Sequence, residues 1–466
     1  MAYRDGATGI GVPPPRYIAL GYSPNLPLRL SLKRTVVRAF QGELELRELI
    51  PKPLRTVAVS VLNWLTTPAA GLRFGEPLFR LLGLRPKLRE RKLQAAKRVL
   101  VIRLDGIGDF VLTTPFLREL RRNAPRAWIT LIVNPGVLNL AELCPYINEV
   151  LTFERRARTA RRRRRHARAL KLAATRLWAR RFDMAIVPRW GVDYYHATYL
   201  AYFSGAPRRV GYSEGVWARK QELNAGFDRL LTDVLTDGSA KHEVEHGLDV
   251  LRFLGGEPVE ARLEVWLNEE DRSFAAEVFA RHGVEGDEPV FALAPGAGTP
   301  KKRWPIERFV ELGRLLLQEC NPKLVIVGGP DDRDLGDRLE AELGRNVINL
   351  AGRTTLRQAA AVLQRCRLIV SNDSGPLHLA AAAGSAVVGI SCHPMGGTAR
   401  HEYSPVVYRP WGVPQAVVQP EQARAPCQDA CEWKQPHCIL GISVQQVWHE
   451  VRRLLAANLR GPWSPG

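Results

Sequence analysis

The stretch Val99-Leu-Val-Ile-Arg-Leu-Asp-Gly-Ile-Gly-Asp109 decides how the rest of the chain is interpreted. An apolar run of strand length leads into a pair of glycines and then into a carboxylate. Because residues 110–122 carry apolar side chains at helical spacing, the segment predicts a β-strand, a tight turn and a helix start. Such a turn brings N–H groups to the carboxyl end of a parallel strand, where open α/β sheets bind ligands. Asp109 is therefore expected either to face a cleft or to cap the helix.

Two long regions of the chain alternate between predicted strands and helices. The first runs from 96 to about 255, with strands expected at 99–104, 128–133, 149–153 and 183–187 and helices at 110–122 and 154–181. The second starts near 290, with strands expected at 290–294, 323–327, 347–350, 368–371 and 386–390 and helices at 306–319 and 356–365, besides two that end at 343 and 383. This alternation predicts the α/β class with doubly wound parallel sheets, and two such domains in tandem imply a cleft between them.

The formal net charge of +20 is concentrated in two segments. Residues 1–100 hold 18 Lys and Arg against 6 Asp and Glu, and residues 154–181 hold 13 against 1. The first segment suits either amphipathic helices at an anionic membrane interface or a solvated extension packed on the next domain. For the second, an anionic partner is favoured, because almost no carboxylates balance the cations. A nucleic-acid-binding protein is only a remote alternative, because no aromatic residues are interleaved with the run of arginines and the chain has no recognisable nucleic-acid-binding module.

The composition is that of a globular protein, with 45% hydrophobic and 24% charged residues. Seven cysteines, in a chain that starts without an apolar signal segment, predict a reducing cytoplasm and no disulfide framework. The longest apolar stretches, such as 56–65, fall short of the roughly 18–20 residues that cross a bilayer. Any membrane contact is therefore expected to be peripheral.

A second ligand-binding turn is predicted where strand 368–370 runs into Ser371-Asn-Asp-Ser-Gly-Pro-Leu-His378. Ser374 or Asp373 is expected at the N-cap of the helix that follows, whose first turn begins Gly-Pro. The free N–H groups and positive dipole end of such a helix suit a diphosphate. His378 lies one turn into the helix and is expected to point back toward the same spot, the alternative being a purely structural histidine.

Cations follow another predicted strand of the same sheet. After the turn at 295–298 comes Thr299-Pro-Lys-Lys-Arg-Trp-Pro305, in which the final proline suits the first turn of a helix. A lysine at this edge can neutralise the charge of a leaving phosphate without a metal ion. The alternative is a basic surface loop.

Several short motifs are spaced along residues 97–445. Besides the first turn and Ser371–His378, they are Thr113-Thr-Pro115, Phe182-Asp-Met-Ala-Ile186, Arg208-Arg-Val-Gly211, His242-Glu-Val-Glu-His246, Lys302-Arg-Trp-Pro305, Val327-Gly-Gly-Pro330 and Leu350-Ala-Gly352. In order and spacing they resemble those of glycosyltransferase family 9, the heptosyltransferases of lipopolysaccharide core assembly and their relatives.

The resemblance implies the GT-B fold, in which two doubly wound Rossmann-like domains face a cleft, here with a basic N-terminal extension. It also implies inverting sugar transfer from a nucleotide diphosphate, with no metal and no cofactor. We accordingly divide the chain into a basic amphipathic extension, an acceptor domain, a nucleotide-sugar domain and a C-terminal helix with a tail, at 1–95, 96–265, 266–445 and 446–466.

Site roles follow from the resemblance position by position. Asp109 matches the acidic residue proposed as the base for the acceptor hydroxyl, and Lys302 matches the lysine that meets the donor phosphates. Asp105 is the competing candidate for the base, but its position before the glycines suggests a role in the turn. Asp331 or Asp332 falls where a ribose-binding carboxylate is expected. The donor-binding set is completed by Gly106, Gly108, Gly296, Thr299, Gly328, Gly352, Asp373, Ser374, Gly375 and His378.

The expected reaction is transfer of a heptose or related sugar from ADP-heptose to a lipopolysaccharide core or other lipid-linked acceptor. It is expected at the inner face of the cytoplasmic membrane, where the basic segments would hold the protein on anionic lipid. The alternative within the family is another nucleotide-sugar donor, in O-antigen or capsule synthesis. Family members usually begin near the first strand, so the extension 1–95 is an addition that can shift the acceptor away from the lipid A-linked core.

Three thiols and an imidazole lie close together in the sequence near the C-terminus, at Cys427, Cys431, His437 and Cys438. This set could make a zinc site. Because the spacing does not repeat as a Cys-x-x-Cys pair, the sequence favours free or structural thiols.

Overall fold

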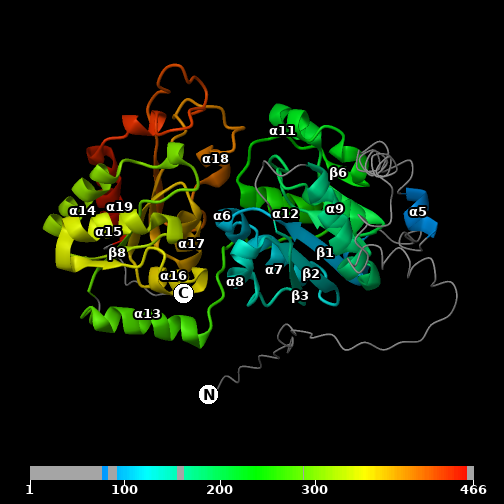
Figure 1. The fold of residues 1–466 in the computed structure, drawn as a ribbon, viewed down its shortest axis with the longest axis horizontal. Helices are drawn as coiled ribbons and strands as arrows, with labels where there is room; N and C mark the ends of the chain where they lie inside the picture. The colour runs from blue at the N-terminus through cyan, green and yellow to red at the C-terminus, as the bar shows by residue number, and fades with distance from the viewer. Residues whose placement is uncertain (1–75, 82–91, 155–161, 287, 459–466) are drawn as a thin grey trace, which may run out of the picture.

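The computed structural model describes residues 76–81, 92–154, 162–286 and 288–458. Most of the basic extension, and 155–161 of the arginine-rich segment, lie outside the described residues. Within them the chain forms two α/β domains side by side, each built around a sheet of six strands (Figure 1). The prediction of two doubly wound domains is confirmed.

The first sheet has the order β3-β2-β1-β4-β5-β6, with every neighbouring pair parallel. Its strands are β1 (Arg98–Arg103), β2 (Trp128–Val133), β3 (Glu149–Thr152), β4 (Met184–Val187), β5 (Arg208–Tyr212) and β6 (Asp233–Leu235). Strands β5 and β6 were not predicted from the sequence, because β5 begins with two arginines and β6 is three residues long. Arg209 fits the sheet since its guanidinium donates to the carbonyls of Leu230 and Ala206.

The second sheet repeats this topology, with the order β12-β11-β10-β7-β8-β9 and only parallel pairs. Its strands are β7 (Val290–Ala294), β8 (Lys323–Ile326), β9 (Val347–Asn349), β10 (Leu368–Asn372), β11 (Ala386–Ile390) and β12 (Gln415–Val418). The edge strand β12 was not among the predicted strands. In both sheets the first strand of the domain lies in the middle, which is the arrangement of dinucleotide-binding folds.

Helices pack on both faces of each sheet. Around the first sheet are α5 (Glu76–Leu81), α6 (Ile107–Val111), α7 (Thr114–Asn123), α8 (Leu138–Ala141), α9 (Arg162–Leu172), α10 (Ala197–Phe203), α11 (Ala218–Leu223) and α12 (Glu243–Phe253). The linker that follows carries α13 (Glu269–Arg281), which packs against the second domain (Figure 1). Around the second are α14 (Ile306–Cys320), α15 (Arg333–Leu343), α16 (Leu356–Gln364), α17 (Gly375–Ala383), α18 (Pro405–Tyr408) and α19 (Val444–Asn458). None of the helices in the described ranges is both long enough and apolar enough to cross a membrane.

Three predicted segments differ in detail from the structure. The helix expected at 110–122 is two helices, α6 and α7, and Pro115 is the second residue of α7, where a proline is tolerated. In the described part of 154–181, α9 gives way to a π-helical turn and then a 3₁₀ turn that ends at Arg180. The segment set apart as a C-terminal helix contributes α19, which packs on α14, β11 and β12 inside the second domain.

The strands are buried on both faces, and alternate residues enter different cores. Val99 and Val101 join the largest apolar cluster, whereas Leu100 and Ile102 join a separate cluster on the other face of the sheet. The largest cluster also takes in one face of the second sheet, including Val290. A single core therefore continues from one domain into the other.

Candidate active site

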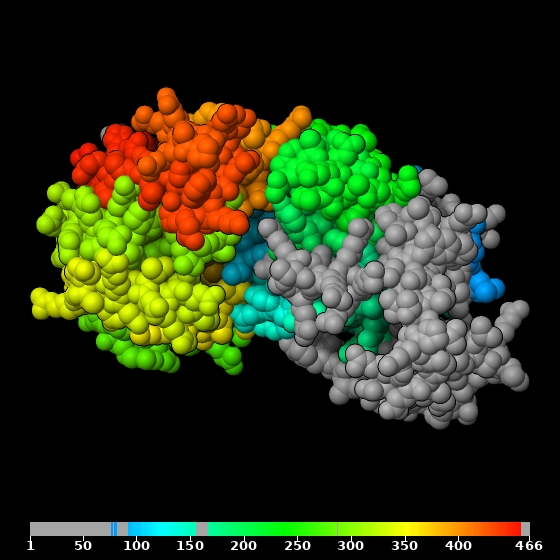
Figure 2. Space-filling model, turned by 45° about the horizontal axis from the view of Figure 1, so that its top comes forward, coloured from blue at the N-terminus to red at the C-terminus, as the bar shows by residue number. Residues whose placement is uncertain are grey.

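Loops from both sheets line one cleft between the domains. The strand order reverses between β1 and β4 in the first sheet and between β7 and β10 in the second, and loops that diverge at such a point leave a crevice. Two adjoining cavities of about 330 and 800 Å³ lie there and share Gly298, Ser374 and Gly375 in their linings. In Figure 2 the domains form two lobes, and blue atoms from the early part of the described chain lie at the junction.

Asp109, in the first turn of α6, both caps the helix and lines the smaller cavity. Its Oδ2 accepts a hydrogen bond from the Gly106 N–H at 3.2 Å. Its side chain is 25% exposed. Asp109 therefore both caps the helix and faces the cleft, because the capping hydrogen bond holds its carboxylate at the cavity.

The other oxygen of Asp109 enters a group of five charged side chains that we name the first-wall network. Oδ1 lies 3.3 Å from guanidinium nitrogens of both Arg103 and Arg189. Arg189 also meets Asp105 at 2.5 Å, and Arg103 meets Glu243 at 2.7 Å. The Asp105 side chain is only 6% exposed, so its carboxylate serves to hold the arginines.

This network sets the charge state of Asp109. Burial on its own raises the pKa of Asp109, but the cations of Arg189 and Arg103 and the Gly106 hydrogen bond lower it, and the resulting pKa lies below the ordinary carboxyl value. Asp109 is thus ionised at neutral pH and able to accept a proton.

Sequence reasoning missed Arg103 and Arg189 and gave Glu243 no role. The pairs join residues far apart in the chain, 140 positions for Arg103 with Glu243 and 80 for Arg189 with Asp109. One local signal existed: Arg103 is a charge at the end of an apolar strand, and a buried charge requires a partner.

The opposite wall carries Lys302, at the end of the 3₁₀ turn η9 (Pro300–Lys302) that follows β7. Its Nζ lies 2.6 Å from Asp373 Oδ2 and 4.3 Å from the centroid of the Tyr403 ring. Asp373 was predicted to bind the donor, and the structure places it where it holds Lys302. Both residues line the smaller cavity.

Three polar atoms on this second wall are buried and have no hydrogen-bond partner among the described residues: Thr299 Oγ1, Ser374 Oγ and His378 Nδ1. Buried polar atoms are nearly always satisfied in native proteins, so such a group on one cavity wall indicates a place for a hydrogen-bonding ligand. Ser374, rather than Asp373, is the N-cap of α17, and its side chain makes no capping bond. Burial lowers the pKa of His378, so its imidazole is neutral at neutral pH.

Two glycines let the domains meet at the cleft. A Cβ on Gly108 would lie 2.5 Å from Cδ2 of His378, and a Cβ on Gly375 would lie 3.0 Å from Cβ of Ile107. Gly108 therefore makes room for the histidine of the other domain.

The larger cavity gathers Gly296, Gly328, Asp331 and Asp332. Asp332 Oδ2 accepts a hydrogen bond from Gly329 N–H at 2.9 Å. Asp331 is exposed, with no hydrogen bond or ion pair to another described residue. Of these two carboxylates, Asp331 is therefore available to a ligand.

Gly352 lies outside the linings of both cavities. Its N–H donates to Gly328 O at 2.9 Å, and its φ of +65° favours glycine. The structure thus places this predicted donor-binding residue in a supporting turn.

Comparison with known proteins places the chain among sugar transferases. A model of the family described as glycosyltransferase family 9 (heptosyltransferase) matches residues 170–435. Lipopolysaccharide heptosyltransferase 2 of Escherichia coli is 26% identical over 309 residues, which cover 63% of this chain and 82% of that protein.

Solved structures share the fold. A glycosyl transferase family 9 protein from Veillonella parvula has a TM-score of 0.62 at 24% identity, and the match covers 79% of this chain and 100% of that protein. The E. coli ADP-heptose lps heptosyltransferase II has a TM-score of 0.56 at 23% identity, over 78% of this chain and 99% of its own. The predicted GT-B arrangement of two Rossmann-like domains is confirmed.

Proposed function

The chain belongs to glycosyltransferase family 9, and on that premise we propose that it transfers a heptose from ADP-heptose to a lipopolysaccharide core, with inversion and without a catalytic metal ion. The relatives described above carry these substrates in their names, lipopolysaccharide in one and ADP-heptose in another. The alternative is a different nucleotide-sugar donor in the same cleft.

One observation carries the proposal: Lys302 and the three unpartnered polar atoms of the second wall line the same cavity as Asp109. The second wall offers a cation, two hydroxyls, an imidazole and the N-terminus of α17, which together suit a diphosphate. The first wall offers an ionised carboxylate, which suits a proton acceptor. Donor and base would thus meet in one cleft.

The proposed reaction is a single displacement. The acceptor hydroxyl oxygen attacks the anomeric carbon as its proton passes to Asp109, and the bond from that carbon to the diphosphate oxygen breaks. Negative charge then grows on the leaving ADP, where Lys302 and the α17 N-terminus stabilise it more strongly than in the ground state. Attack from the face opposite the leaving group inverts the anomeric configuration.

The nucleoside would occupy the larger cavity, which adjoins the smaller one at Ser374 and Gly375. Asp331 lies in its lining with an available carboxylate, so we assign the ribose hydroxyls to Asp331 rather than to Asp332. Asp332 is already bonded to a backbone N–H of its own turn.

The test of the donor is calorimetric binding of ADP, UDP, GDP and CDP to the full chain, in metal-free buffer and again with Mg²⁺ added. We expect selective ADP binding that Mg²⁺ leaves unchanged. Preference for UDP, GDP or CDP would replace the donor, and binding that requires Mg²⁺ would contradict metal-independent transfer. The anomeric configuration of the product, read by NMR, tests inversion.

We also propose that the protein works at the inner face of the cytoplasmic membrane, held there by its basic segments. The support is the charge of residues 1–100 and 154–181, which suits anionic lipid. Sedimentation with anionic and with neutral vesicles tests this, and deletion of 1–75 should release the protein from the anionic ones. Equal binding to both kinds of vesicle would contradict the proposal.

A further inference from the structure

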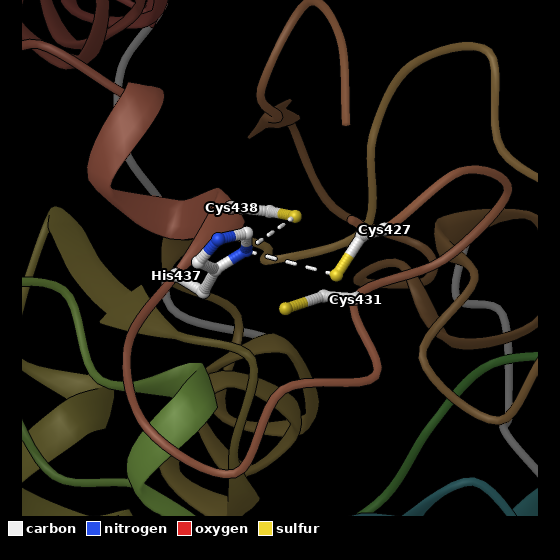
Figure 3. Close-up of side chains that lie close together, drawn as sticks. All are labelled: Cys427, Cys431, His437 and Cys438. Carbon is white, nitrogen blue, oxygen red and sulfur yellow. Dashed lines mark hydrogen bonds between the residues drawn. The ribbon is translucent and has the colours of Figure 1, made fainter. Parts of the chain in front are cut away.

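The loop after β12 brings four potential metal ligands to one point. Cys427, Cys431, His437 and Cys438 each offer one ligand atom, and all four atoms lie within 4.8 Å of one another (Figure 3). Nδ1 of His437 is 3.6 Å from the sulfur of Cys427 and 3.6 Å from that of Cys438. The sequence spacing gave only a weak indication of this cluster, because it is the fold of the loop that closes it.

The chemistry and the distances suit zinc. Three thiolates and one imidazole form a ligand set that zinc binds tetrahedrally, with Zn–S near 2.3 Å and Zn–N of about 2.0–2.1 Å. Ligand atoms on such a tetrahedron are roughly 3.5–3.8 Å apart, which matches the two His437 distances of 3.6 Å. The four ligand atoms lie within 4.8 Å of one another, so the most distant two would have to approach by about 1 Å to reach the tetrahedral spacing. A disulfide would use two of the thiols and leave the imidazole without a function.

The surroundings indicate a closed, structural site. Cys431 and Cys438 are buried in the apolar cluster of the second domain, and Cys427 packs against it. None of the four residues lines either cavity of the cleft. Four protein ligands complete a zinc coordination shell and leave no open position for catalysis.

Regular backbone structure does not hold this loop in place. Between β12 and the 3₁₀ turn η12 (Cys438–Gly441), residues 419–437 contain no helix or strand. The loop nevertheless reaches the cleft wall, because Lys301 Nζ donates to the carbonyl oxygen of Cys431 at 3.2 Å. Lys301 precedes Lys302 in η9, so whatever fixes the loop also supports the turn that carries Lys302.

We infer that Cys427, Cys431, His437 and Cys438 bind one structural zinc ion, which fastens this loop behind the turn η9. The binding of the ion stands on the cluster alone. Its consequence for donor binding rests on the proposed function.

Metal content provides the first test. The full chain, purified in reducing buffer, should hold about one zinc per chain by inductively coupled plasma mass spectrometry. Cys431→Ser and His437→Gln should lose it, whereas Cys320→Ser, at the end of α14 and outside the cluster, should keep it. Cobalt in place of zinc should give the visible absorption of a tetrahedral thiolate site, and His437→Gln should change that spectrum.

Three results would overturn the inference: a folded wild-type chain without stoichiometric zinc, an equimolar amount of another metal, or zinc content that none of the cluster variants changes. If Cys431→Ser fails to fold, Cys427→Ser and His437→Gln decide the question, because both positions are only half-buried. A disulfide between any two of the three cysteines in the reduced preparation would also overturn it.

Stability separates this inference from the proposed function. Removal of zinc by a chelator should lower the melting temperature by more than about 5 °C and weaken ADP binding, and added zinc should restore both. An unchanged melting temperature in the zinc-free chain would overturn the structural role. One zinc per chain together with no ADP binding would count against the proposed donor and leave the zinc site standing.

Discussion

The two walls of the cleft use their polar groups in opposite ways. In the first wall, Asp105, Asp109 and Glu243 meet Arg103 and Arg189 in ion pairs. In the second wall, Thr299 Oγ1, Ser374 Oγ and His378 Nδ1 are buried without a partner among the described residues. The charges of the first wall are paired with one another before a ligand arrives, although Arg103 Nε and Glu243 Oε2 make no hydrogen bond among the described residues. The second wall keeps three unpartnered polar atoms on residues that line the cavity.

This difference separates stability from binding. Removing a member of a buried ion pair leaves its partner charged and desolvated, so changes in the first wall should lower the stability of the fold. Removing an unpartnered hydroxyl leaves nothing unsatisfied, so loss of the Thr299 or Ser374 hydroxyl from the second wall should lower ligand affinity without lowering stability. Asp109 is the exception in its wall, since it is partly exposed to the cavity.

The largest effect is expected for Asp109→Asn. The amide keeps the shape of the side chain but cannot accept the proton, so kcat should fall about 10²- to 10⁴-fold while ADP affinity is retained. Single-turnover kinetics and calorimetry measure the two quantities. The matched control is Asp105→Asn, which should lower the free energy of unfolding by about 3–5 kcal/mol because it breaks a buried pair. A normal rate for Asp109→Asn would remove this residue as the base.

Lys302→Ala should come next, with a fall in kcat of about 10²- to 10³-fold and weaker ADP binding, because a charge that stabilises the leaving diphosphate is lost. Lys323→Ala, at the start of β8 and outside both cavities, is the matched control and should change neither value. If Lys302→Ala behaves like this control, the phosphates lie elsewhere.

A smaller effect is expected from Arg189→Gln, read as a pH profile. Arg189 lowers the pKa of Asp109, so its removal should raise that pKa and move the acid limb of kcat/KM to higher pH by about one unit. Arg189→Lys keeps the cation and should shift the limb less. An acid limb at the wild-type position in Arg189→Gln would show that another group limits activity at low pH.

The smallest effect is expected for Ser374→Ala. The hydroxyl has no partner to lose, so the melting temperature should stay within error of the wild type, while ADP affinity falls about 3- to 10-fold. Thermal unfolding without a nucleotide and calorimetry with ADP measure the two. A lower melting temperature with unchanged ADP affinity would show that the Ser374 hydroxyl stabilises the fold, and would contradict the difference proposed between the two walls.

The sequence could predict features that are local in the chain. A strand, a glycine turn and a helix start are encoded within a dozen residues, which is why Asp109, Lys302 and Ser374 could be named before the structure. The strands of both sheets other than β5, β6 and β12 followed from the same local signals, as did the N-cap of α17, expected at Asp373 or Ser374. The four-residue cluster at 427–438 was visible as composition, but its closure depends on the path of the loop.

Features that join distant segments could not be read in this way. Gly108 was assigned to the donor-binding set, yet the atom nearest to the position of a Cβ on this glycine belongs to His378 of the other domain. One partner of Arg103 is Glu243, which lies 140 positions away in α12, and only the tertiary fold brings the two together. Strand β6 has only three residues, too few to show an alternating apolar pattern. It is recognised as a strand only by its pairing with β5.

The apolar cluster that continues from one sheet to the other has a consequence for how the molecule melts. Phe110 of the first domain and Leu379 of the second belong to the same cluster, so neither domain can unfold without exposing apolar surface on its neighbour. Such sharing makes unfolding cooperative across the boundary between the domains. A nucleotide that touches only the second wall will therefore protect the first domain from heat as well.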